Sequence, residues 1–232
     1  MADDRLEERI SAILSRMSET QGVDEDLAAD IAWLADRCRR LDRNLNKISR
    51  MSDRMQGQIM DLNDKLRVAS ITDPLTGLTN RRGAHDALIA QTGVAREQGS
   101  SFFVALIDID HFKGVNDTHG HDVGDEVLIE FSSRLATAMP DQALLARWGG
   151  EEFLILLSEM DQVSCVSMIE GFHESLRAKP FTTAVGELRV TASSGVSCYQ
   201  RKEVGYDSTI YRADQALYEA KESGRDRWVM AA

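Results

Sequence analysis

A long heptad-like repeat in the first third of the chain limits the available folds more than any other feature. From Leu27 to Ala69 an apolar residue returns at alternating intervals of four and three, and Ser52 is the one polar member of the series. The average interval of about 3.5 residues is the period at which α-helices supercoil. The predicted helix would be roughly 65 Å long at about 1.5 Å per residue, so it needs a partner helix, most simply the same helix of a second chain. The series is Leu27, Ile31, Leu34, Cys38, Leu41, Leu45, Ile48, Ser52, Met55, Ile59, Leu62, Leu66 and Ala69.

A shorter apolar repeat precedes the long one. We expect a short helix over residues 3–20 and the long helix over residues 24–70, with Asp24 as its N-cap. The short helix could fold back on the long one as a hairpin, which would give a four-helix bundle in a dimer, or it could bind another protein. Apolar stripes on helices are usually packing surfaces, which favours the bundle. Residues 1–70 are therefore predicted to serve dimerisation or regulation.

Composition and charge exclude several classes of protein. The 232 residues carry a formal net charge of −11, so general binding to nucleic acid is not expected. No apolar run reaches about 18 residues, and the N-terminus lacks the basic start and apolar stretch of a secretory signal. We therefore expect no membrane span and a cytoplasmic location. Three widely spaced cysteines argue against a disulfide framework and against a zinc site.

Residues 71–232 are predicted to form an α+β domain. Its core order, βαββαβ, is that of the ferredoxin-like fold, an antiparallel sheet with its helices expected on one face. Helices are expected at 81–97, 122–138, 162–178 and 207–222. Strands are expected at 102–108, in a hairpin at 143–157, near 188–199 after a small hairpin, and around 228–230.

The predicted hairpin turns at Gly149 and Gly150, which two carboxylates, Glu151 and Glu152, follow directly. Glycines can supply the positive φ angles of tight hairpin turns, and they let a ligand lie against the backbone. Taken alone, such a short motif is more often an exposed turn with ordinary charges. Its meaning depends on what lies beside it.

In the predicted sheet, the strand that ends at Asp108 runs antiparallel to the strand that begins at Glu151. The two carboxylates should therefore converge, with the main-chain carbonyl of Ile109 beside them. Clustered carboxylate and carbonyl oxygens suit Mg²⁺ or Mn²⁺, and without a cation the acids would repel one another. The sequence thus predicts a divalent-cation site at this end of the sheet.

The segment after Asp108 could bind a nucleotide. Backbone N–H groups at a turn into a helix can hold phosphates, and Lys113 adds a cation. Asn116 and Asp125 could bind guanine, because a carboxylate accepts hydrogen bonds from the N1 and N2 donors of that base. Taken singly, each of the two is more often a cap or turn residue.

Four motifs, in order, make the chain resemble the GGDEF-domain diguanylate cyclases over about residues 71–231. The resemblance implies a nucleotide-cyclase-like palm in which two GTP molecules, one on each of two facing domains, condense into cyclic di-GMP and release pyrophosphate. The motifs are Asp73–Arg82 (DPLTGLTNRR), Asp108–Asp125, Gly149–Phe153 (GGEEF) and Ala213–Arg225 (ADQALYEAKESGR).

The resemblance also implies roles for single residues. Asp108, the Ile109 carbonyl and Glu151 would hold two divalent ions, Mg²⁺ or Mn²⁺, in each half-site. Glu151 or Glu152 could take the proton of the attacking hydroxyl, and Lys113 would neutralise phosphate charge. Lys221 and Arg225 would do the same, although with Gly224 they also make an ordinary helix end. The implied GTP site is Phe112, Lys113, Asn116, His121, Asp125, Gly149, Gly150, Lys221 and Arg225.

One departure from the family pattern concerns regulation. Many members carry an Arg-x-x-Asp motif that binds the product, and its arginine and aspartate fall at the positions that Pro140 and Ala143 occupy here. Without the bidentate arginine and its acidic partner, we expect no product inhibition through this site.

Other functions are compatible with parts of the pattern. The main alternative is a non-catalytic GTP-binding signalling module whose helices dock a partner protein, but the intact set of site residues argues against it. A cyclic di-GMP receptor is disfavoured by the missing arginine and aspartate, and a palm-like enzyme acting on nucleic acid by the acidic charge. The preferred prediction is an active homodimeric diguanylate cyclase, whose helical region could also bind a regulatory protein.

Overall fold

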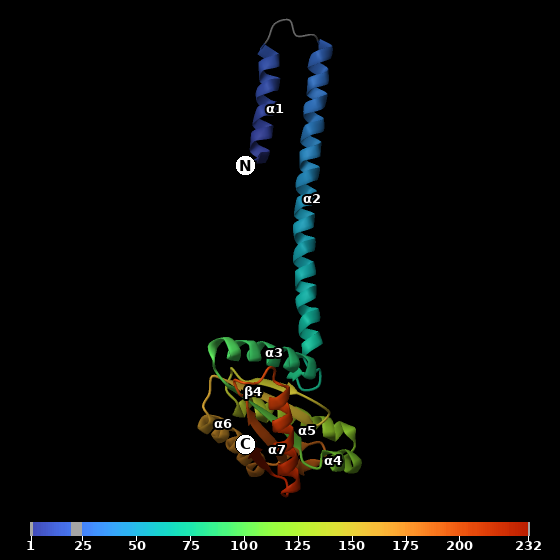
Figure 1. Cartoon of the computed structure of the whole chain (residues 1–232). Coiled ribbons are helices and arrows are strands. Elements are labelled where there is room, and N and C mark those ends of the chain that lie inside the picture. Colours follow the sequence, from blue (N-terminus) through green and yellow to red (C-terminus); the bar gives the residue numbers. More distant parts are fainter. Residues whose placement is uncertain (1, 20–24, 232) are drawn as a thin grey trace. The chain divides into compact units, whose positions relative to one another are not determined.

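The computed structural model describes residues 2–19 and 25–231, and the chain divides into two compact units, Met1–Lys65 and Leu66–Ala232 (Figure 1). The first unit is helical and the second contains the sheet. The predicted break at residues 21–24, including the predicted N-cap Asp24, lies outside the described residues.

The first unit comprises α1 (Ala2–Glu19) and most of α2 (Glu25–Ile71). The 47 residues of α2 contain no proline, so nothing in the sequence forces a break. Ile10 on α1 and Ala35 on α2 are buried, but the apolar repeat along α2 is largely exposed, as at Leu45 (63%) and Ile48 (64%). A single chain therefore leaves this repeat accessible to a partner helix. No helix in the described part of the chain is both long and apolar enough to cross a membrane.

The second unit is built on a six-stranded sheet with the strand order β1-β3-β4-β2-β7-β8. Strand β2 pairs antiparallel with both β4 and β7, and the edges β1–β3 and β7–β8 are parallel. The predicted pairing of the first and third core strands is thus present as β2–β4. The strands are β1 (Thr79–Asn80), β2 (Phe102–Ile109), β3 (Leu144–Arg147), β4 (Glu152–Ser158), β7 (Ala192–Cys198) and β8 (Arg227–Met230), with a separate hairpin of β5 (Phe181–Thr183) and β6 (Gly186–Leu188).

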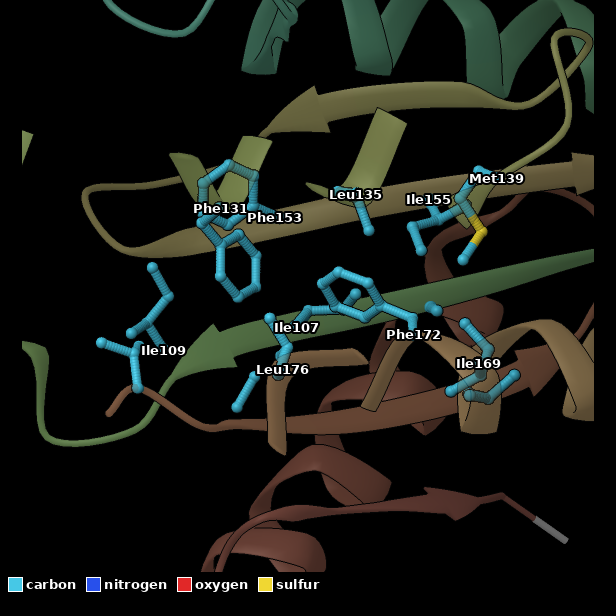
Figure 2. Close-up of a cluster of buried hydrophobic side chains, with 14 of the residues drawn as sticks. Ile107, Ile109, Phe131, Leu135, Met139, Phe153, Ile155, Ile169, Phe172 and Leu176 are labelled. Carbon is cyan, nitrogen blue, oxygen red and sulfur yellow. The ribbon is translucent and has the colours of Figure 1, made fainter. Parts of the chain in front are cut away.

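Helices cover both faces of this sheet, so the prediction that they lie on one face was wrong. On one face, Phe131 of α5 packs against Phe153 of the sheet with ring centroids 4.8 Å apart, and Phe172 of α6 packs against Phe131 at 5.4 Å (Figure 2). On the other face, Leu88 of α3 and Leu217 of α7 pack in a second cluster. The helices are α3 (Arg81–Gln98), α4 (Phe112–His119), α5 (His121–Ala138), α6 (Gln162–Ala178) and α7 (Asp207–Glu222).

The physical reason for two covered faces is visible in β2. All eight of its residues are buried. Phe103, Ala105, Ile107 and Ile109 enter the cluster under α5 and α6, whereas Phe102, Val104 and Leu106 enter the cluster under α3 and α7. A strand that is buried along its whole length and apolar at every position but Asp108 needs cover on both sides, and its lack of alternation was the signal for this arrangement.

The predicted helices and strands are otherwise present with small shifts in their ends, and the ferredoxin-like α+β fold is confirmed. Two elements were not predicted. The short strand β1 adds to the sheet edge, and α4 occupies residues that were expected to form a turn. α4 begins directly after His111, whose φ of 57° lies in the left-handed region and turns the chain sharply away from β2.

Close packing of α7 on β7 depends on Gly195. A Cβ atom at this position would lie 2.0 Å from the main-chain oxygen of Ala213 and 2.2 Å from the main-chain nitrogen of Leu217. Because both atoms belong to the helix backbone, no side-chain rotation could relieve the overlap. Any larger residue would move the helix.

We expect Gly195→Ala to lower the free energy of unfolding of the sheet-containing unit by about 3 kcal/mol or more, since α7 must shift away from the sheet. Gly93→Ala is the matched control: Gly93 is exposed on α3 and a Cβ there meets nothing within 4 Å. That change should stabilise the helix by about 0.5–1 kcal/mol. Chemical denaturation measures both values, and similar effects of the two variants would contradict the close approach.

Candidate active site

The β2–β4 register brings the predicted carboxylates to one end of the sheet. Asp108, at the end of β2, lies opposite Glu152, the first residue of β4. The main-chain N–H of Ile109 donates a hydrogen bond to the main-chain oxygen of Glu151 at 3.3 Å. Asp108, Ile109 and Glu151 are therefore neighbours, as predicted, although Glu151 belongs to the turn rather than to the strand.

Lys221, on the last turn of α7, joins this cluster. Its Nζ lies 2.9 Å from Oδ2 of Asp108, and the side chain of Asp108 is only 11% exposed. Burial raises the pKa of Glu151, the charge of Asp108 raises it as well, Lys221 opposes the rise, and Glu152 adds to it. Three carboxylates thus share one ammonium group, so the site carries an excess of negative charge.

The donor set fits a hard divalent cation. Among the described residues, no three His, Cys, Asp or Glu side chains are arranged to hold a metal. The predicted ligands are instead two carboxylates and one main-chain carbonyl, all oxygen atoms, which Mg²⁺ and Mn²⁺ prefer. Burial and the charge of Asp108 both raise the pKa of Glu151, and a bound cation would favour the ionised form against both.

The turn between β3 and β4 is closed by main-chain and arginine hydrogen bonds. The N–H groups of Trp148 and Gly149 both donate to the main-chain oxygen of Glu152, at 2.7 and 3.1 Å. Nε and Nη2 of Arg147 donate to the main-chain oxygen of Gly150 at 3.1 and 2.8 Å. The backbone on both sides of Glu151 is thereby held.

Arg147 also fastens this turn to the start of the domain. Its Nη1 lies 3.3 Å from Oδ1 of Asp73, which accepts hydrogen bonds from the N–H and hydroxyl of Thr76. Burial alone would raise the pKa of Asp73, but the Thr76 hydrogen bonds and the Arg147 charge hold it below its usual value. The sequence alone did not single out Arg147, because nothing local indicates a partner so far away along the chain.

The backbone angles of the two turn glycines differ from the prediction. Neither Gly149 nor Gly150 is among the glycines with positive φ, so the predicted left-handed turn is wrong. The connection between β3 and β4 spans residues 148–151, and loops of this length commonly use a type I turn, which needs no positive φ. A Cβ on Gly149 would lie 2.5 Å from Oε2 of Glu152, whereas one on Gly150 would meet nothing within 4 Å. Gly150 therefore leaves open space beside the carboxylates.

The predicted guanine-binding residues lie on two successive helices. Asn116 is on α4 and Asp125 is on α5, and neither is a helix cap, since the N-caps are His111 and Gly120. Oδ1 of Asn116 would lie 2.0 Å from a Cβ on Gly124. Gly124 thus lets the Asn116 side chain lie against α5 next to Asp125. Sequence reasoning missed this role, although a glycine in the first turns of a helix was a visible signal.

The remaining predicted site residues differ in accessibility. Lys113, His121 and Asp125 are exposed, so they are available to a ligand. Phe112 is only 5% exposed and packs in the core beside α5, so only its main chain can face a nucleotide. Arg225 is half-buried and follows the end of α7, where its N–H donates to the main-chain oxygen of Ala220 at 3.0 Å. The helix-end role of this segment is therefore present.

A cavity of about 350 Å³ lies beside the cluster on the α7 side. It gives Glu152 and Lys221 access to a space next to the metal-ligand candidates. Its lining is Glu152, Asp214, Gln215, Leu217, Tyr218 and Lys221. At the positions of the product-binding motif, the Ala143 N–H donates to the main-chain oxygen of Pro140 at 2.9 Å, and neither residue has a polar side chain.

Comparison with known proteins places these features in one family. The family described as "Diguanylate cyclase, GGDEF domain" matches residues 70–227. The diguanylate cyclase DgcP of Pseudomonas aeruginosa is 31% identical over 226 residues, which cover 97% of this chain and 32% of that protein. The response regulator PleD of Caulobacter vibrioides is 40% identical over 171 residues, covering 72% of this chain and 37% of PleD. The chain spans about a third of the length of these curated relatives.

Solved structures extend the similarity to the helical region. The diguanylate cyclase SiaD, crystallised with its activator SiaC from Pseudomonas aeruginosa, is 38% identical, with a TM-score of 0.69 over 98% of this chain and 89% of SiaD. The coiled coil and GGDEF domain of DgcB from Caulobacter crescentus, in complex with c-di-GMP, is 29% identical, with a TM-score of 0.73 over 82% of this chain and 99% of that one.

The raised pKa of Glu151 generates a prediction about stability. A carboxyl whose pKa is raised by folding destabilises the folded protein only when it is ionised. Its effect on the free energy of unfolding is therefore absent at a pH below its unfolded-state pKa and complete above its folded-state pKa. Without divalent cations, Glu151→Gln should therefore raise the melting temperature near pH 7.5 but not near pH 3.5. The rise should be only about 1–2 °C, because solvent screens this half-exposed group.

The same variant should lose the stabilisation that Mg²⁺ gives to the wild-type protein. Glu174→Gln is the control, since Glu174 is an exposed acid on α6 and should leave both effects unchanged. Thermal melts with and without Mg²⁺ measure the differences. A wild-type Mg²⁺ effect that persists in Glu151→Gln would argue against Glu151 as a ligand.

Proposed function

Because the chain belongs to the GGDEF family of diguanylate cyclases, we propose that it condenses two GTP molecules into cyclic di-GMP and two pyrophosphates. The observation that supports this most directly is the meeting of Asp108, Ile109, Glu151 and Lys221 at one end of the sheet. In each of two steps a 3′-hydroxyl attacks the α-phosphorus of the other GTP. A new P–O bond forms there, and the bond to pyrophosphate breaks.

Two carboxylates and a carbonyl would hold the divalent cations of each half-site, Mg²⁺ or Mn²⁺, two per site by analogy with the family. The ligands are Asp108, the main-chain oxygen of Ile109 and Glu151. When bound, such cations orient the attacking hydroxyl and stabilise charge on the transferring phosphoryl group. Lys113, Lys221 and Arg225 add positive charge for the triphosphate. Glu151 or Glu152 accepts the hydroxyl proton.

Guanine recognition is assigned to Asn116 and Asp125, with His121 near the nucleotide. A carboxylate at Asp125 accepts hydrogen bonds from N1 and N2 of guanine, and adenine offers no such pair of donors. The open space at Gly150 would let the nucleotide approach the turn, while the main chain of Phe112 contributes an N–H at the start of α4.

Each half-site would hold one GTP, so the reaction needs two copies of the unit Leu66–Ala232. The exposed apolar repeat of α2 is suited to bring the copies together as a homodimer. SiaD was crystallised with its activator SiaC, which supports a regulatory protein as a further partner of the helical region. Pro140 and Ala143 replace the arginine and aspartate of the product site, so we propose that the enzyme is not inhibited through that site. A cytoplasmic location fits the use of GTP.

Purified protein incubated with GTP and Mg²⁺ should form cyclic di-GMP, which chromatography with mass detection identifies. Glu151→Gln should lower the rate by at least about 10³-fold, because both a metal ligand and a charge at the reacting centre are lost. Size-exclusion chromatography should give the same oligomeric state for the variant. GTP binding without product at any protein concentration would instead support the non-catalytic signalling module.

Removing residues 1–65 should make the specific activity depend steeply on protein concentration, because the two half-sites must then meet without the coiled coil. The cut is placed at residue 65 because Ser70 and Ile71 contact the domain: the side chain of Asn80 donates to the Ser70 main-chain oxygen at 2.9 Å, and Ile71 lies against Gly83. The full chain, assayed over the same concentration range, is the control. Full activity of the shortened chain at nanomolar concentration would remove the coiled coil from the mechanism.

A further inference from the structure

Asp110 is a buried carboxylate that the proposed reaction does not use. It is 6% exposed and lies two residues beyond Asp108. Its Oδ2 accepts hydrogen bonds from the Thr191 hydroxyl at 2.7 Å and from the Asp226 N–H at 3.0 Å, and its Oδ1 accepts one from the Ser193 hydroxyl at 2.7 Å. One side chain thus ties the end of β2 to the start of β7 and to the segment after α7.

The segment after α7 has an unusual backbone. Gly224, Arg225 and Asp226 have consecutive positive φ angles of 107°, 60° and 48°. A left-handed conformation costs roughly 1–2 kcal/mol for a residue with a side chain, so the run persists only where surrounding contacts hold it. The N–H that donates to Asp110 belongs to the peptide that joins Arg225 to Asp226. Asp110 therefore bonds to the strained peptide itself.

Other contacts to this segment are more exposed or lie at its ends. The Asp226 carboxylate pairs with Nη1 of Arg177 at 3.3 Å, with both side chains 37% exposed. The Arg225 N–H donates to the Ala220 main-chain oxygen, which continues the end of α7. The bond to Asp110 is the buried one of this group and links the segment to the strand that carries Asp108.

We propose that Asp110 is a positioning residue for Arg225. Its carboxylate fixes the Arg225–Asp226 peptide relative to the end of β2, so that the Arg225 guanidinium is held where the triphosphate binds. This inference rests on the proposed function, in which Arg225 neutralises phosphate. Lys221 needs no such anchor, because it lies within the regular turns of α7 and reaches Asp108 directly.

The hydrogen-bond pattern predicts which substitutions preserve the anchor. An asparagine at position 110 can place its oxygen toward Thr191 and Asp226, and its NH₂ group toward Ser193, whose hydroxyl oxygen can accept. Asp110→Asn therefore keeps all three contacts with one reversed. Asp110→Ala removes all three and leaves the Asp226 N–H without this acceptor.

The experiment measures the affinity for 3′-deoxy-GTP in the full chain by calorimetry with Mg²⁺, since this nucleotide binds but has no hydroxyl with which to react. Asp110→Ala and Arg225→Ala should each raise the dissociation constant about tenfold, and Asp110→Asn should stay within about twofold of wild type. In the double variant Asp110→Ala/Arg225→Ala, the increase should not exceed that of Arg225→Ala alone. An additive double variant, or an Asp110→Asn as weak as Asp110→Ala, would overturn the proposal.

Controls separate positioning from folding. Ser194→Ala removes a buried hydroxyl of the same strand that bonds to His173 rather than to Asp110, and it should leave the affinity unchanged. Hydrogen exchange of the Asp226 N–H in the ligand-free protein should accelerate at least about tenfold in Asp110→Ala and not in Asp110→Asn; an unchanged rate would contradict the anchor. If Asp110→Ala fails to fold, Thr191→Val removes one donor and should give a smaller affinity loss that again disappears in Arg225→Ala.

The two proposals fail in different ways. Absence of cyclic di-GMP from the wild-type protein with GTP and Mg²⁺ would defeat the proposed function, while exchange at Asp226 would still test the anchor. Normal product formation together with additive effects of Asp110→Ala and Arg225→Ala would defeat the positioning role alone.

Discussion

The register between β2 and β4 is the constraint on which the rest of this structure depends. A shift by one residue would move every side chain of a strand to the opposite face of the sheet. β2 is buried on both faces and apolar except at Asp108, so both clusters of core side chains oppose such a shift. The same register sets Asp108 opposite Glu152 and beside Glu151. Core packing thereby holds together carboxylates that repel one another. The site for a cation is thus formed before any cation binds.

Prediction from the sequence succeeded where a pattern is local or where topology implies a contact. The period of the apolar residues predicted the helices, and the βαββαβ order predicted that Asp108 and Glu151 would meet. It failed where side-chain geometry decides. The Gly149–Gly150 pair is compatible both with turns that need positive φ and with turns that do not, and in the folded protein it adopts a turn without positive φ, closed by the hydrogen bonds of the Trp148 and Gly149 N–H groups to the Glu152 oxygen.

Long-range polar partners formed the second class of missed features. Asp110, Thr191 and Asp226 lie far apart in the sequence, and each alone resembles an ordinary polar residue of a loop or strand end. His173 is another example, since no pattern indicated that it would be fully buried against Ser194, where burial lowers its pKa to about 4. The identity of the partner of such a residue depends on how strands and helices pack.

The polar contacts at the start of the domain connect two places that seem unrelated in the sequence. The side chain of Asn80 donates to the main-chain oxygens of Ser70 and Thr72, at the end of α2, and Asn80 lies beside Arg147 in the β1–β3 register. Arg147 in turn bonds to Asp73 and to the main-chain oxygen of Gly150. A continuous series of hydrogen bonds and one strand pairing therefore joins the last turn of α2 to the turn that carries Glu151. The segment between the helix end and Gly150 contains no slack linker, because every step along it is a hydrogen bond or a paired strand.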